Sequence, residues 1–169
     1  MLNETLKIDM NTKVKKIPGV NSICDYFIEK GINSKRPISN KKLQKLLYYA
    51  QAWSLVLRNK RLFDDSFEAW VHGPAIRSVY KKYKKFGYNP ITEVDENESF
   101  KISNDTKKIL DEVWRVYGSK DANYLELLTH AEKPWIDARD GLSVHQSSDN
   151  VITRKKMKKY YSSLLPEPK

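Results

Sequence analysis

The stretch from Ser39 to Arg58 constrains the fold more than any other, because its apolar residues follow the 3.6-residue period of a helix. The apolar stripe consists of Leu43, Leu46, Leu47, Ala50, Trp53 and Leu57. Between positions 46 and 57 only Gln51 and Ser54 are frankly polar, which predicts a helix buried on nearly every side. The apolar run is shorter than the roughly twenty residues that cross a bilayer. We therefore expect the central helix of a mainly α, compact domain that does not contact a membrane.

The remaining elements follow from similar patterns. Helical spacing and capping residues predict further helices at 20–31, 75–87, 103–118, 121–130, 134–141 and 153–164. Weak alternation predicts a short strand over 67–71, with 100–102 as the candidate second strand of one β-pair. Gly73 and Pro74 are expected to form a sharp entry into the next helix. Within the helices, the pattern assigns Tyr80, Tyr83 and Tyr124 to the buried side.

Length and composition indicate a single domain. A chain of 169 residues with 40% apolar and 31% charged residues suits one core of ordinary size. We assign residues 1–18 to a flexible basic arm and residues 19–165 to one helical domain. Cys24 is the single cysteine, so no internal disulfide is expected, and no secretory leader is recognised. Both features favour a cytoplasmic protein.

The net charge of +10 favours a polyanionic partner or an acidic protein partner. Two basic segments, 77–85 and 154–159, are candidate nucleic-acid surfaces because they interleave lysines with tyrosines. The tyrosines, however, fall on the predicted inward stripes. Core tyrosines with solvated lysines are therefore the favoured interpretation, and nucleic-acid binding is the alternative.

The sequence offers little support for catalysis or for a metal or cofactor. The three histidines lack the i, i+4 spacing of a zinc helix, and one cysteine cannot form a thiolate cluster. Glycine-rich phosphate loops and a nucleophile elbow are absent. We therefore expect no metal, no cofactor and no enzymatic activity. An enzyme with its site at His130, Glu132 and Arg139 is the weakest alternative.

Two corners of the chain hold polar residues that need a role. Glu132 and Arg139 flank Pro134 and Trp135, and we expect an arginine–carboxylate pair that braces the turn beneath Trp135. Exposed recognition by this corner is the alternative. For His72, before Gly-Pro, we expect a hydrogen bond to a nearby backbone carbonyl, with partner contact as the alternative.

Three segments are distinctive when they are taken in order: KLQKLLYYAQAWSL at 42–55, FEAWVHGPAIRSVYKKYKKFG at 67–87 and LTHAEKPWIDAR at 128–139. Together they resemble the Panacea family, also described as SocA-like or GepA-like antitoxin domains. The resemblance runs from about Ser22 to Tyr161 and excludes the basic arm.

The resemblance implies a compact helical antitoxin that neutralises a cognate protein toxin by direct binding. In the family the toxin is commonly encoded by an adjacent gene, often in prophage-like regions, and no catalytic residues are established. A related member implies an alternative, in which the protein is a proteolytic adaptor that delivers its toxin to a protease. The predicted partner-binding residues are His72, Arg77, Tyr80, Glu132, Trp135 and Arg139, which lie in these segments and include the aromatic and arginine types that dominate protein interfaces.

Overall fold

The computed structural model describes residue 17, residues 19–94 and residues 102–169. The predicted arm therefore lies almost wholly outside the described residues, and so does most of the predicted strand at 100–102. The described chain is mainly helical, as predicted. Its α-helices are α1 (Val20–Asn33), α2 (Asn40–Arg58), α3 (Arg77–Tyr83), α4 (Asn104–Tyr117), α5 (Ala122–His130), α6 (Lys133–Arg139) and α7 (Arg154–Ser163), and a short 3-10 helix, η1 (Lys84–Phe86), continues α3.

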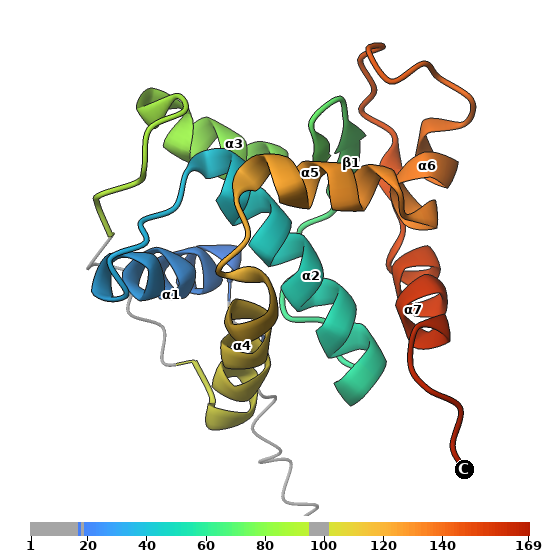
Figure 1. Cartoon of the computed structure of the whole chain (residues 1–169), viewed down its shortest axis with the longest axis horizontal. Helices are drawn as coiled ribbons and strands as arrows, with labels where there is room; N and C mark the ends of the chain where they lie inside the picture. The colour runs from blue at the N-terminus through green and yellow to red at the C-terminus, as the bar shows by residue number, and fades with distance from the viewer. Residues whose placement is uncertain (1–16, 18, 95–101) are drawn as a thin grey trace, which may run out of the picture.

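Helix α2 occupies the centre of the domain, with α1, α4, α5 and α7 packed around it (Figure 1). Most of its residues as far as Leu55 are buried, which confirms the prediction of a central buried helix. The prediction for Leu57 is wrong, because this side chain is 58% exposed. The last turn of α2 lies beside α4, where Arg58 donates to the Thr106 hydroxyl at 3.3 Å, and Leu57 is left facing solvent.

Both ends of α2 are closed by capping residues. The Ser39 hydroxyl accepts a hydrogen bond from the Lys42 amide at 3.3 Å, which satisfies one of the unpaired amides of the first turn. Asn59 ends the helix in the left-handed conformation, with φ of 53°.

The two polar residues within the apolar part of α2 fasten the segment that follows it. Gln51 donates to the Phe63 carbonyl at 2.9 Å and accepts from the Leu62 amide at 2.7 Å. Ser54 donates to the Lys60 carbonyl at 2.7 Å. These bonds satisfy polar groups that α2 and its connector would otherwise bury without partners.

The strands form a small antiparallel sheet of β1 (Phe67–Trp70), β2 (Gly73–Ala75) and β3 (Val151–Ile152), in the order β2-β1-β3. The predicted first strand is confirmed. The prediction that Gly73 and Pro74 enter a helix is wrong, because they pair with β1 and α3 begins only at Arg77. Pairing of Trp70 with Gly73 leaves a two-residue turn, and Gly73 supplies a φ of +94° directly after it.

Helix α5 lies across the outside of the domain and contacts α2 along one side (Figure 1). This position explains why Leu125 is buried while Tyr124, predicted to be buried, is exposed. No helix in the described part of the chain is long and apolar enough to cross a membrane.

We predict that Gln51→Leu destabilises the domain, although leucine suits a buried helix. The Leu62 amide and the Phe63 carbonyl would lose their partners, and each unsatisfied buried group costs about 1–3 kcal/mol. The measurement is the free energy of unfolding by chemical denaturation. Leu57→Gln, on the exposed end of the same helix, is the control and should change that free energy by less than about 1 kcal/mol. Equal effects of the two substitutions would contradict the prediction.

Candidate functional site

Three of the six predicted site residues lie together on the surface around the β1–β2 hairpin. His72 is in the turn, with a side chain that is 71% exposed, and Arg77 begins α3. Tyr80 lies one turn later and is 37% exposed, so its predicted inward orientation is wrong. The Tyr80 ring packs edge-on against Trp70 with 5.0 Å between ring centroids, because this part of α3 faces the hairpin.

Trp70 is the residue that the sequence interpretation missed. The Arg77 guanidinium lies 5.3 Å from the centre of the Trp70 ring and is paired with Glu68 through two hydrogen bonds, of 3.1 and 2.7 Å. We call Glu68, Trp70, Arg77 and Tyr80 the hairpin cluster. Alternation along β1 was the available signal, since it places Phe67 and Ala69 inside and an acid and a tryptophan on the opposite face.

A hollow of about 520 Å³ opens beside this cluster, and we call it the hairpin hollow. It is formed by the hairpin, the start of α3 and the loop before β3. Its lining residues are Trp70, Val71, His72, Arg77, Ser147, Ser148 and Asp149.

Arg139 holds two walls of the hollow from behind. Its side chain is 2% exposed and donates to the Ala69 carbonyl of β1 at 2.8 Å. It also donates to the Ser143 carbonyl at 2.8 Å and to the Gln146 carbonyl, both in the loop before β3. One buried guanidinium therefore fixes the strand and the loop relative to each other.

The predicted pair between Arg139 and Glu132 does not form. These residues stand at opposite ends of α6, seven positions apart, which is roughly 10 Å along a helix axis. Glu132 instead accepts hydrogen bonds from the hydroxyls of Tyr49, at 3.0 Å, and Tyr161. Burial raises the pKa of Glu132, although both tyrosine hydroxyls favour the carboxylate. Glu132 thus joins the start of α6 to α2 and α7.

Trp135 is buried behind the hairpin and links it to α5 and α6. Its indole nitrogen donates to the Trp70 carbonyl at 2.9 Å. The Arg139 guanidinium lies 4.8 Å from the centre of its ring, and the His130 ring stacks on it at 3.9 Å. Burial lowers the pKa of His130, which favours the neutral imidazole. The expectation of a structural brace around Trp135 is therefore correct in position, although its bonds differ from those predicted.

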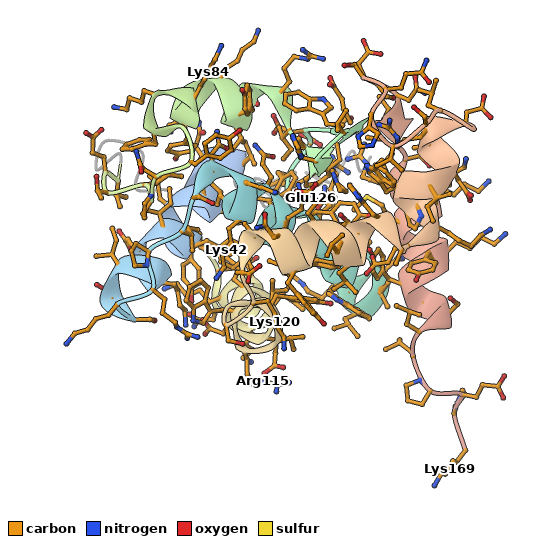
Figure 2. The ribbon with its side chains drawn as sticks, turned by 45° about the horizontal axis from the view of Figure 1, so that its top comes forward. Lys42, Lys84, Arg115, Lys120, Glu126 and Lys169 are labelled. Atoms are coloured by element: carbon orange, nitrogen blue, oxygen red, sulfur yellow. The ribbon has the colours of Figure 1, made fainter. Side chains whose placement is uncertain are left out.

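His72 also differs from the expectation. Its Nδ1 lies 3.1 Å from a carboxylate oxygen of Glu126, so a side chain on α5, and not a backbone carbonyl, orients the ring. Figure 2 shows Glu126 on the side of α5 that faces α2 and the hairpin. The second oxygen of Glu126 pairs with the Lys41 ammonium group.

Within the described ranges, no group of three or more histidine, cysteine or acidic side chains is arranged to hold a metal ion. Cys24 is fully buried, and burial raises the pKa of its thiol, so the reactive thiolate is disfavoured. The candidate site is therefore a surface of aromatic and arginine side chains on a small helical domain. A buried polar network holds this surface in place.

Comparison with known proteins identifies the family to which this domain belongs. The family model described as "Antitoxin SocA-like, Panacea domain" matches residues 43–136, which is more than half of the chain. The protein belongs to this family. The match includes five of the six predicted site residues, and Arg139 lies just beyond it.

The chain is also similar to the antitoxin SocA of Caulobacter vibrioides (strain NA1000 / CB15N), with 36% identity over 66 residues. That match covers 39% of this chain and 35% of SocA, so it spans about a third of the curated relative. No solved structure matches the chain.

We predict that Arg139→Met destabilises the protein by about 3 kcal/mol. The substitution keeps most of the side-chain length but removes the charged donor from three carbonyls, and breaking such buried interactions is costly. The measurement is urea unfolding. The control is Arg115→Met, since Arg115 is exposed and pairs only with Glu112 in the described chain; it should leave the unfolding midpoint unchanged. A midpoint for Arg139→Met that equals the control's would refute the brace.

Proposed function

We propose that this protein is an antitoxin that neutralises a cognate protein toxin by binding it directly at the hairpin cluster and hollow. The observation that carries the proposal is the Trp70–Arg77–Tyr80 arrangement on a member of an antitoxin family, in which Arg77 and Tyr80 are exposed and Trp70 is half-buried. Tryptophan, tyrosine and arginine supply most interface hot spots. The proposed action is stoichiometric binding, not catalysis.

The cluster is held in one arrangement before any partner arrives. Glu68 fixes the Arg77 guanidinium with two hydrogen bonds, and the Trp70 ring contacts both Arg77 and Tyr80. A side chain that is already ordered loses less conformational entropy on binding. This supports a specific contact surface in preference to a merely solvated one.

The six predicted residues then divide into two roles. His72, Arg77 and Tyr80 are exposed and are proposed to contact the toxin, together with Trp70. Glu132, Trp135 and Arg139 are buried in the free protein, and we assign them the support of that surface. This division assigns contact to three of the six predicted partner-binding residues and support to the other three.

The charge of the chain favours an acidic toxin. A net charge of +10 attracts a negatively charged protein over several ångströms and raises the rate of encounter. We propose that the toxin is encoded by an adjacent gene, as the family resemblance implies.

The test is co-expression of this protein with the product of the adjacent reading frame, scored by growth and then by co-purification. The proposal expects a neighbour that is toxic alone, harmless in the pair and eluted together with this protein. Rescue without a complex would refute direct binding and favour proteolytic delivery. A harmless neighbour, with this protein retarding nucleic acid at low salt, would refute the antitoxin role.

We predict that Trp70→Ala and Arg77→Ala each weaken toxin binding by at least about tenfold, mainly through faster dissociation. Both side chains stand on the solvent side of the hairpin, so folding should survive. Surface plasmon resonance with the purified toxin measures the change. Arg115→Ala, an exposed arginine on α4, is the matched control and should bind like the unaltered protein. Binding that survives both hairpin substitutions would place the interface elsewhere.

A further inference from the structure

Lys45 is a lysine with almost no contact with water. It lies on α2, is 2% exposed, and donates from Nζ to the Pro74 carbonyl of β2 at 3.0 Å. Within the described chain this is its one hydrogen bond, and no carboxylate lies within ion-pair distance. Buried lysines are rare unless they are paired, so the placement of this amine beneath the hairpin needs a reason.

The amine packs directly against the residue that follows the hairpin turn. A Cβ on Gly73 would lie 2.6 Å from Cε of Lys45 and 2.8 Å from the Thr129 hydroxyl oxygen. Glycine is therefore required at position 73 by space as well as by its φ of +94°. The close approach means that the turn cannot move inward without displacing the Lys45 side chain.

The charged groups around Lys45 connect it to the surface. On α5, Glu126 favours its charged form, whereas Lys41, one turn earlier on α2, opposes it. The Lys45 charge also lowers the pKa of His130, at the end of α5. The hairpin contributes His72, which holds the opposite side of the Glu126 carboxylate. Burial, the largest effect, lowers the pKa of Lys45 to about 7, so the amine changes charge near neutral pH.

We propose that Lys45 is a positioning residue for the partner-binding surface: its buried amine fixes the Pro74 carbonyl and thereby the direction in which His72 and the hairpin hollow face a toxin. The effect on toxin binding rests on the proposed function, and the positioning of the hairpin rests on the geometry around Lys45. The charged ammonium group is the stronger donor to the Pro74 carbonyl, so protonation of Lys45 favours the hairpin arrangement that a toxin would contact. Binding and protonation of Lys45 are therefore linked, and binding weakens as the pH rises from 6 to 8.

The first test needs no toxin. In the full-length His72→Gln protein, which lacks the imidazole beside Glu126, the ¹³Cε resonance of Lys45 is followed by NMR from pH 5 to pH 10. We expect a midpoint near 7 for Lys45 and the same midpoint in the amide resonances of residues 71, 73 and 75. Amide resonances that do not follow the Lys45 titration would overturn the proposal.

The second test compares two lysine-to-methionine substitutions on α2. Lys42 is the matched control, because its Nζ also donates to a carbonyl, that of Gly118, at 2.6 Å, yet it faces the end of α4, away from the hairpin (Figure 2). Lys45→Met should abolish the hairpin titration, weaken toxin binding about tenfold and remove the Lys45 part of its pH dependence. Lys42→Met should change none of these.

The outcomes separate the two proposals. If the unaltered protein binds no toxin, the proposed function fails, and the amide titration still decides the positioning role. If the unaltered protein binds and Lys45→Met binds equally well with the same pH profile, the positioning role is wrong and the antitoxin proposal stands. Should Lys45→Met fail to fold, the titration in the His72→Gln protein alone decides whether Lys45 positions the hairpin.

Discussion

The burial of α2 on nearly all sides is the constraint on which the rest of the domain depends. Every polar side chain on such a helix must find a partner in whatever segment covers it. Gln44 bonds both backbone groups of Ile76, Lys45 bonds Pro74, Tyr49 bonds Glu132 and Gln51 bonds the 62–63 segment. Each of these bonds fixes a different element, so α2 sets the positions of the hairpin, of α3 and of α6. Apolar packing holds the domain together, and these polar contacts fix where each surrounding element lies relative to α2.

The proposed binding surface consists of an exposed layer over a buried one. Arg77, Tyr80 and the half-buried Trp70 form the outer layer, and Trp135 and Arg139 reach its backbone from inside. Since the buried layer bonds to carbonyls of β1, the outward side chains of β1 can vary without disturbing their support.

The sequence predicted the helices and β1 well, because amphipathic period, capping residues and alternation are local signals. It failed where position depends on distant residues. The strand that pairs with β1 on its far side, β3, is about eighty residues away, and two residues carry too little pattern to be recognised. Tyr80 packs against the Trp70 ring at the surface and not into the core, and the helical spacing of α3 cannot reveal this contact. The opposite charges of Glu132 and Arg139 suggested a pair that does not form. Glu132 instead accepts from tyrosines 29 and 83 residues away, and Arg139 donates to the Ala69 carbonyl 70 residues away.

The contacts of Arg139 also bear on when the surface comes into existence. They join α6 and the loop after it to β1, and β3 then completes the sheet, so the hollow depends on contacts between residues far apart in sequence. Contacts of this kind form late in folding, because the intervening chain must first be ordered. During synthesis the ribosome releases α2 and the hairpin well before residues 139–152. A partner that recognises the hollow would therefore not bind incomplete nascent chains. It would bind only protein whose translation has passed β3.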